Sequence, residues 1–369
     1  MGNRRQNEGG ALTMKIGLVT SQYWPHTGGV ETHVEQIATR LVDRGHTVTV
    51  ISADAKAGLA EMTVRDGVLI RRFRPIGPSD TFHLAPGIIP LVRRMDFDIV
   101  HTHNYHSFPF ALGAVGSRAP TVCTPHYHGG SANPLRDTLL SFYQPIGQTV
   151  FEKSVATIAV SKWEQEQLAA DFGTESKIIP NGIEVERFRN TPPAETAGPT
   201  LLTVGRLVEY KGIQHVIRAL SDLPEYRLRV AGDGPYRDAL EVCAREVGVF
   251  DRVEFLGYVP DPELPGQYAA ADVFVSMSSV EAAGITVGEA LAAGTPAVVR
   301  PSKGLVDWAQ RDDCFAADPA TLATFVKRAR SRSAPSEPLP TWSKAVDEIE
   351  SVYQGVIDSA DYGAKDCTL

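Results

Sequence analysis

The chain has 369 residues, of which 43% are hydrophobic and 22% charged, a composition typical of a globular protein long enough for two domains. The formal net charge is −8, with +1 on residues 1–190 and −9 on residues 191–369, which argues against a uniformly basic surface for nucleic acid. Four scattered cysteines without a CxxC pair suit a reducing compartment, and no stretch reaches the ~18 apolar residues of a membrane span. We therefore expect a cytoplasmic protein.

The first predicted strand leads into a glycine-rich loop. Residues 16–19 are an apolar run of the kind that forms a buried parallel strand. Gly28 and Gly29 follow it, and glycine lets the backbone approach a ligand closely. An amphipathic helix that stops at Gly45 and a second strand at 46–52 complete a β-loop-α-β unit. Its loop lies where open α/β sheets bind ligands, although a plain glycine turn is the alternative and a GxGxxG fingerprint is absent.

Two stretches of the first half are unusual in composition. Residues 1–13 have no apolar core, so we interpret them as a disordered extension and not a signal peptide. Residues 65–94 contain six arginines around the apolar run 84–91. Such a stretch could rest on an anionic membrane surface; the alternative is a solvated rim around a buried loop.

Nine of the ten histidines lie between positions 26 and 128. Five of them follow two predicted strand ends: His101, His103, His106, His126 and His128. Histidines gathered at strand carboxyl ends indicate the polar floor of a pocket. A zinc cluster is the alternative, but no Glu or Cys at zinc-ligand spacing completes it, so we expect no metal.

The alternation of strands and helices restarts after a proline-rich segment at 190–199, which we interpret as a linker. The predicted strands of this second βα domain are 200–204, 228–231, 253–256, 273–275 and 296–299. An amphipathic helix over 342–356 follows, and the polar tail from residue 358 is expected to fray.

A helix predicted to start near Gly284 follows one of these strands and presents unpaired backbone N–H groups, which makes an anion site. Glu281 lies in the loop before it and Glu289 about one turn inside. Arg206 and Lys211 lie in another loop that follows a strand, so they can reach the same crevice and bind phosphate. Read singly, the two glutamates are explained equally well as solvated acids, and Arg206 and Lys211 are more often surface salt-bridge partners.

Taken together, these elements resemble the retaining glycosyltransferases of family 4, which have the GT-B fold. The resemblance runs from residue 14 to residue 357. It rests on Gly28-Gly29-Val30-Glu31, Asp98-Ile-Val-His-Thr-His103, Thr124-Pro-His126, Ile179-Pro-Asn-Gly-Ile183, Gly205-Arg-Leu, Lys211-Gly212, Gly232-Asp-Gly-Pro235, Phe255-Leu-Gly257 and the two glutamates at 281 and 289. The chain departs from the family at Ala283, where an aromatic residue is usual, and in a short segment after Gly304.

The resemblance implies an α/β protein of two Rossmann-like domains that face each other across a deep inter-domain cleft, with the final helix crossing back to the N-terminal domain. We place the boundaries as follows: a disordered extension (1–13), an N-terminal acceptor-binding domain (14–189), a linker (190–199), a C-terminal nucleotide-sugar-binding domain (200–340), a returning helix (341–357) and a tail (358–369).

The resemblance also implies a retaining, metal-independent transfer of a hexose-type sugar from GDP-mannose or a UDP-sugar to a glycan or lipid-linked acceptor, with no cofactor and no nucleic-acid partner. A GT-B nucleotide-sugar epimerase or sugar phosphorylase, and a non-catalytic binding protein, are the alternatives. The implied roles are diphosphate neutralisation by Arg206 and Lys211, diphosphate capping by the N–H groups of Gly284, Ile285 and Thr286, ribose binding by Glu289, sugar binding by Glu281, and approach to the reacting sugar by His126 near Gly28 and Gly29.

Overall fold

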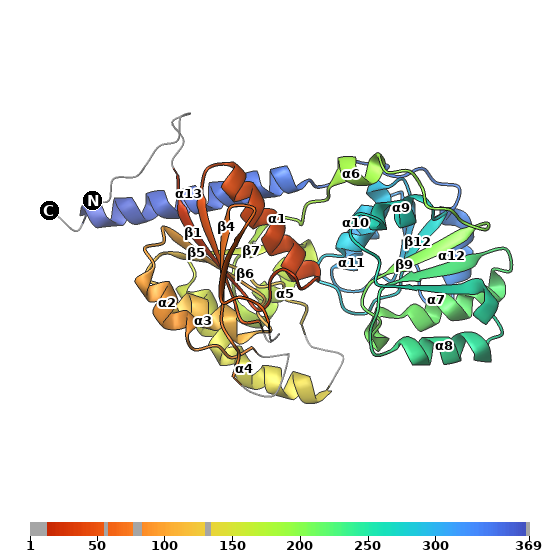
Figure 1. The fold of residues 1–369 in the computed structure, drawn as a ribbon, viewed down its shortest axis with the longest axis horizontal. Coiled ribbons are helices and arrows are strands. Elements are labelled where there is room, and N and C mark those ends of the chain that lie inside the picture. The colour runs from red at the N-terminus through yellow and green to blue at the C-terminus, as the bar shows by residue number, and fades with distance from the viewer. Residues whose placement is uncertain (1–12, 55–57, 77–82, 130–133, 367–369) are drawn as a thin grey trace. The chain divides into compact units, whose positions relative to one another are not determined.

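The computed structural model describes residues 13–54, 58–76, 83–129 and 134–366. Nearly all of the predicted extension (1–13) and the last residues of the predicted tail lie outside them. The chain divides into two compact units (Figure 1). Unit 1 runs to Pro180 and takes up the chain again at Trp342, and unit 2 is Asn181–Thr341. Each unit is built on its own β-sheet, and no helix among the described residues is long and apolar enough to cross a membrane.

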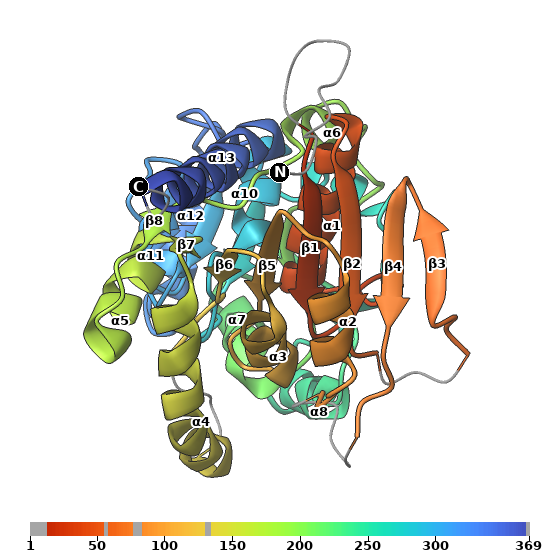
Figure 2. The same ribbon diagram turned by 90° about the vertical axis from the view of Figure 1, so that its left-hand side faces the viewer.

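The sheet of unit 1 has the strand order β3-β4-β2-β1-β5-β6-β7-β8, which Figure 2 shows side by side. Only the β3–β4 pair of this sheet is antiparallel. The strands are β1 (Lys15–Thr20), β2 (Thr47–Ser52), β3 (Met62–Arg65), β4 (Val68–Arg72), β5 (Ile99–His103), β6 (Thr121–Thr124), β7 (Ala156–Ala159) and β8 (Lys177–Ile178). The helices are α1 (Gly29–Asp43), α2 (Ile88–Arg94), α3 (Phe108–Gly116), α4 (Pro134–Lys153), α5 (Lys162–Phe172) and α13 (Trp342–Asp366).

Helix α13 returns to unit 1, as predicted. Its buried residues Val346, Ile349 and Tyr353 share one apolar core with α1 and β1. The predicted end of this helix at 357 is wrong, because α13 continues to Asp366. The Ser359 hydroxyl donates to the Gly355 carbonyl, four residues back, and so supports the helix where the side chains turn polar. Polar composition lowers burial but does not by itself end a helix.

The sheet of unit 2 is parallel throughout, with the order β11-β10-β9-β12-β13-β14. The strands are β9 (Thr200–Val204), β10 (Arg227–Ala231), β11 (Val253–Gly257), β12 (Val273–Ser276), β13 (Ala297–Val299) and β14 (Cys314–Ala316). The helices are α6 (Val185–Arg189), α7 (Ile213–Ala219), α8 (Arg237–Glu246), α9 (Leu264–Ala269), α10 (Ile285–Ala292), α11 (Leu305–Trp308) and α12 (Leu322–Ala329), with 3-10 turns η1 (Glu209–Lys211), η2 (Leu220–Asp222) and η3 (Phe250–Arg252).

The boundary between the units lies earlier than predicted. Residues 181–189 were assigned to the first domain, but they belong to unit 2, where Phe188 is buried with its ring centre 5.6 Å from that of Tyr268. The expected linker also lies on unit 2, since the Ala194 N–H donates to the Gly266 carbonyl at 2.9 Å. The proline content correctly indicated that residues 190–199 lie at the surface. It did not reveal that the preceding helix, α6, is anchored to unit 2 by the buried side chain of Phe188.

Each sheet reverses its strand order at one point, between β1 and β5 in unit 1 and between β9 and β12 in unit 2. Numbered within unit 2, the order is 3-2-1-4-5-6, that of dinucleotide-binding sheets, and ligands of such sheets bind at the reversal, outside the carboxyl ends of the strands. Gly28 and Gly29 follow β1, Arg206 and Lys211 follow β9, and Glu281 follows β12. The predicted site residues of each unit therefore lie at its reversal point or close to it.

Candidate functional site

In unit 2, the loops after β9 and β12 are joined directly. The Ser279 N–H donates to the Tyr210 carbonyl at 2.8 Å. The Lys211 ammonium lies 2.5 Å from the Glu281 carboxylate, and these side chains are only 22% and 19% exposed. The structure thus brings together two of the predicted residues and pairs them with each other. In this state Glu281 neutralises the charge that we predicted for a phosphate.

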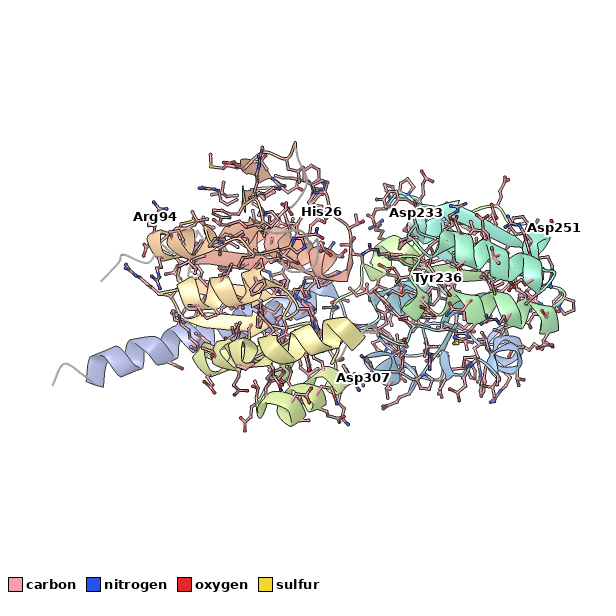
Figure 3. All side chains as sticks on the ribbon, turned by 90° about the horizontal axis from the view of Figure 1, so that it is seen from below. His26, Arg94, Asp233, Tyr236, Asp251 and Asp307 are labelled. Atoms are coloured by element: carbon pink, nitrogen blue, oxygen red, sulfur yellow. The ribbon has the colours of Figure 1, made fainter. Side chains whose placement is uncertain are left out.

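A third loop supports this arrangement. Asp233 and Tyr236, labelled in Figure 3, lie in the loop after β10. Its backbone holds Leu207 from both sides, because the Leu207 N–H donates to Asp233 at 2.9 Å and the Leu207 carbonyl accepts from Tyr236 at 3.0 Å. Arg206, the residue before Leu207, is exposed. Its backbone is therefore fixed while its guanidinium is accessible to a ligand.

Helix α10 begins where the sequence predicts. Gly284 is its N-cap residue, with φ +65°, and a Cβ there would lie 2.6 Å from a methyl carbon of Leu305. The indole N–H of Trp308 donates to the Ala283 carbonyl at 2.6 Å and fixes the chain just before the helix. The first N–H groups of a helix have no acceptor within it, so Gly284, Ile285 and Thr286 present donors at this point.

Glu289 lies one turn inside α10 and accepts a hydrogen bond from the Tyr268 hydroxyl at 2.7 Å. Removal from water raises the pKa of Glu289 to about 7, and the nearby Asp261 adds to the shift, against the opposing effects of Tyr268 and Arg187. Glu289 is therefore close to half-protonated at neutral pH. The sequence did not predict Tyr268, whose only signal was an aromatic residue in a short apolar helix.

In unit 1, the loops after β5 and β6 are also joined, and the second carries His126. The Tyr105 N–H donates to the Pro125 carbonyl at 2.8 Å. His126 is 5% exposed and has φ +48°, in the left-handed region that side-chain-bearing residues rarely adopt. Such strain persists only where surrounding contacts impose it, and it concentrates at functional sites.

A buried glutamate imposes this conformation. Glu164, on α5, is fully buried and accepts hydrogen bonds from the backbone N–H of Val160, at 2.7 Å, and from that of Tyr127, the residue after His126. Burial raises the pKa of Glu164 to about 8. The sequence Ser161-Lys-Trp-Glu164 has the form of a capping box, and Ser161 does cap α5, but the glutamate instead fastens the His126 loop.

Replacing Glu164 with glutamine is expected to loosen this loop. Each of the two carboxyl oxygens of Glu164 accepts one backbone N–H, whereas an amide has a single acceptor oxygen. One buried N–H therefore loses its partner, at a cost of about 1–3 kcal/mol of folding free energy. Urea unfolding measures the loss. Glu166→Gln, an exposed glutamate on the same helix, is the matched control and should stay within about 0.5 kcal/mol of the wild type. Equal effects of the two substitutions would contradict this role of Glu164.

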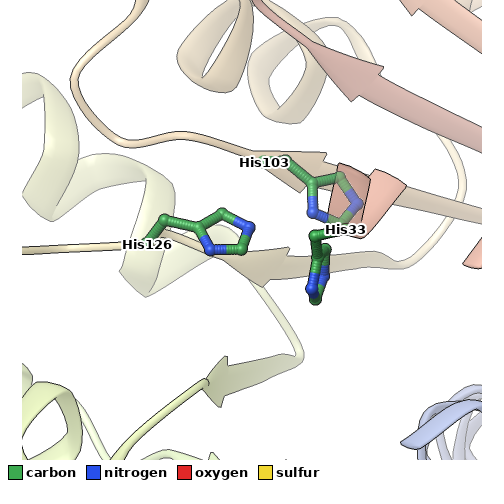
Figure 4. A group of neighbouring side chains, drawn as sticks. All are labelled: His33, His103 and His126. Carbon is green, nitrogen blue, oxygen red and sulfur yellow. The ribbon is translucent and has the colours of Figure 1, made fainter. Parts of the chain in front are cut away.

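Three histidines from different elements meet beside this loop (Figure 4). The ring centre of His33, on α1, lies 4.5 Å from that of His126 and 5.3 Å from that of His103, on β5. All three are buried. Burial lowers the pKa of His103 and His126 well below the usual value, so both imidazoles are neutral. The structure gathers His103 and His126 of the predicted set into one buried cluster, and no sequence pattern indicated that His33 joins them.

Not every predicted histidine belongs to this cluster. The ring centre of His101 lies 4.1 Å from that of His103, but its two ring nitrogens pair with the Tyr353 hydroxyl at 2.7 Å and with Thr124 at 2.8 Å. His106 and His128 stack on each other, with ring centres 3.9 Å apart. These contacts give His101 a structural role that anchors α13 to the sheet.

Gly28 and Gly29, at the start of α1, differ in the space that surrounds them. A Cβ on Gly28 would collide with the carboxylate of Glu31, whose pKa is raised by burial, whereas a Cβ on Gly29 would meet nothing within 4 Å. The end of the Glu31 side chain is flexible and can move aside, so the packing favours Gly28 without requiring it, and Gly29 leaves open space at the start of the helix.

Two of the six arginines in 65–94 form ion pairs with carboxylates of unit 1. Arg72 is buried and lies 2.9 Å from Asp54, and Arg65 lies 2.6 Å from Glu35. Arg74, Arg93 and Arg94 are exposed. The stretch is thus part structural and part basic surface, and part of it, residues 77–82, lies outside the described residues.

Two α/β units, each built on a Rossmann-like sheet with one reversal point, match the GT-B class of glycosyltransferase folds. The profile of Glycosyltransferase Family 4 matches residues 27–187, and that of Glycosyl transferases group 1 matches residues 184–331. The chain belongs to glycosyltransferase family 4, and the protein is a transferase.

Individual relatives agree with this assignment. The chain is 31% identical to a GDP-mannose-dependent alpha-(1-6)-phosphatidylinositol monomannoside mannosyltransferase of Mycolicibacterium smegmatis, over 78% of this chain and 80% of the relative. Sucrose-phosphate synthase from Thermosynechococcus elongatus matches 94% of this chain and 100% of its own with a TM-score of 0.78 at 19% identity. HepE of Anabaena, solved in complex with UDP, matches 96% of this chain and 100% of its own with a TM-score of 0.70 at 19% identity.

Proposed function

We propose that the protein is a retaining, metal-independent glycosyltransferase that moves a hexose from a nucleotide sugar to a glycan or lipid-linked acceptor in the cytoplasm. The observation that carries the proposal is the joined pair of loops at the reversal point of unit 2, where Lys211, Glu281 and the start of α10 meet. GDP-mannose and UDP-sugars are the candidate donors. The mannosyltransferase relative is GDP-mannose-dependent, and HepE was solved with UDP.

The transfer reaction requires positive charge close to the leaving diphosphate. Cleavage of the anomeric C–O bond places negative charge on the departing diphosphate. Arg206, Lys211 and the N–H groups at the start of α10 stabilise it where it forms, which is the role a divalent cation has in other transferases. Donor binding draws Lys211 from Glu281 to the diphosphate. Glu281 is then free to accept hydrogen bonds from hydroxyls of the transferred sugar, and Glu289 from those of the ribose.

Retention follows if the acceptor attacks on the face that the diphosphate leaves, with the departing phosphate helping to take the acceptor proton. His126 contributes to this step through contact with the transferred sugar. Its loop geometry, with a strained φ fixed by Glu164, is what supports the assignment.

A screen of UDP-, GDP- and ADP-sugars tests the proposal. One donor class should raise the melting temperature, and its nucleotide should be released only when an acceptor is present and without loss in EDTA. The configuration at the anomeric carbon of the product, read by NMR, should match that of the donor. Nucleotide release without acceptor, or conversion of the donor to an isomer, would favour the phosphorylase or epimerase alternatives. Loss of transfer in EDTA would contradict metal independence.

Donor affinity should depend on pH through Glu289. Its raised pKa of about 7 means that the carboxylate, which accepts ribose hydroxyls best, is formed as the pH rises through neutrality. The affinity for the nucleoside diphosphate should therefore rise about tenfold between pH 6 and pH 8. Calorimetry at both pH values measures it. Glu289→Gln should remove the dependence, and a pH-independent affinity in the wild type would contradict this role.

We also propose that unit 1 contacts an anionic membrane surface peripherally. Met62 and Val64 on β3 are 61% and 65% exposed, and exposed Arg74, Arg93 and Arg94 lie on the same unit. Exposed apolar side chains with nearby cations suit an anionic lipid surface. The protein should sediment with anionic vesicles and not with zwitterionic ones, and equal sedimentation with both would contradict the proposal.

A further inference from the structure

We propose that His33, His103 and His126 form a binding site for one divalent transition-metal ion, with Zn²⁺ as the expected occupant. Each residue offers one ring nitrogen, and these three nitrogens all lie within 4.8 Å of one another. Figure 4 shows the three side chains next to one another, with His33 supplied by α1, His103 by the end of β5 and His126 by the loop after β6.

The ring positions match a three-histidine metal site. A metal about 2.1 Å from each nitrogen in a tetrahedral arrangement holds imidazole centres roughly 5 Å apart. The centres in this cluster are 4.5, 5.3 and 6.0 Å apart. The nitrogens are too close together for a sugar ring to enter among them, and small rotations of the rings bring them to bonding distance. A single atom is therefore the occupant that fits.

Two of the three histidines, His103 and His126, carry ring nitrogens without a hydrogen-bond partner among the described residues. These atoms are both ring nitrogens of His103 and the Nε2 of His126, and all of them are buried. Nearly all buried polar atoms in proteins are paired, and an unpaired one calls for a role such as holding an ion. By contrast, His101, on the same strand as His103, has both nitrogens paired.

The donor set favours zinc. Imidazole nitrogens suit Zn²⁺, and three histidines leave the fourth tetrahedral position for water. The site is held by secondary structure on two sides, since His33 and His103 lie on a helix and a strand, and Glu164 fixes the third loop. The three-histidine ligand set contains no carboxylate or cysteine. Zinc-motif spacings that include those residues therefore do not detect this site in the sequence.

A consequence follows that rests on the proposed function. A metal bound by His126 takes the ring that we propose contacts the transferred sugar. Zinc should then inhibit transfer while leaving the nucleoside diphosphate affinity of unit 2 unchanged. The metal acts as an inhibitor of a reaction that does not itself require one.

Metal content of the full chain tests the site without reference to activity. EDTA-treated protein is mixed with excess Zn²⁺, desalted and analysed by plasma mass spectrometry. The wild type should retain one equivalent, and so should His215→Ala, a control histidine in unit 2. His33→Ala and His103→Ala should each lower the retained zinc at least about tenfold, the loss expected when a three-histidine site is reduced to two ligands. Retention of no zinc by the wild type, or of a full equivalent by both variants, would overturn the site.

Glutamine variants and cobalt substitution test the same site when an alanine variant does not fold. If an alanine variant does not fold by circular dichroism, His33→Gln and His103→Gln replace it with the same expectation. Co²⁺ in place of zinc should give the visible bands of a tetrahedral site in the wild type, and their absence would count against it. Zinc binding without any transferase activity would refute the proposed function and not the site, whereas EDTA-insensitive transfer in protein that binds no zinc would refute the site alone.

Discussion

Replacing Lys211 with alanine is expected to lower kcat/KM for transfer by about 10²–10³-fold, the cost typical of losing one group that stabilises charge in a transition state. Two effects combine. The leaving diphosphate loses a positive partner, and Glu281, which is 19% exposed and lies 2.5 Å from Lys211, is left as an unpaired carboxylate that repels the donor. Initial rates at several donor concentrations measure the change.

A double-mutant cycle separates these two effects. If repulsion by Glu281 contributes, Lys211→Ala/Glu281→Gln should bind the nucleoside diphosphate more tightly than Lys211→Ala alone, although transfer stays low because the sugar contact is also lost. Lys327→Ala, an exposed lysine on α12, is the matched control and should be silent. Wild-type kcat/KM in the Lys211 variant would show that the loops after β9 and β12 do not hold the diphosphate.

The sequence predicted the parts of the site that depend on local chain geometry. The start of α10 near Gly284 was predicted from an apolar strand followed by a loop that opens a short helix, and the structure has Gly284 there with φ +65°. The two loops of unit 2 were predicted to converge because parallel strands end at one edge of a sheet. Strand alternation likewise indicated both domains, so the fold class followed from pattern and resemblance together.

What the sequence did not reveal depends on contacts between distant residues. The ion pair between Lys211 and Glu281 joins residues 70 positions apart, and neither residue type specifies its partner. His33 lies within the predicted amphipathic helix, where no pattern marked it for the site, although its ring reaches His103 and His126. Glu164 had the form of a local capping residue, but its carboxylate binds a backbone 37 positions away. Each of these is decided by tertiary packing.

Replacing His126 is expected to have the second large effect, a fall of about 10²–10³-fold in kcat, the cost typical of losing one polar group that contacts the reacting centre in the transition state. Asparagine is the sharper substitution. It adopts positive φ more readily than most residues and keeps a polar group, so His126→Asn should fold in the same loop conformation as the wild type. Rapid-quench measurement of a single turnover with saturating donor reports the chemical step.

The affinity for the nucleoside diphosphate distinguishes a role in transfer from general damage. His126 belongs to unit 1, whereas the proposed diphosphate ligands belong to unit 2, so calorimetry should give a Kd within about twofold of the wild type while kcat falls, as expected for an interaction made only in the transition state. A matched fall in affinity and rate would point to disrupted folding. Full activity in His126→Asn would show that the strained loop, and the glutamate that holds it, serve packing alone. A lowered kcat with an unchanged Kd is therefore the result expected if the left-handed backbone at His126 serves to hold the imidazole in contact with the reacting sugar.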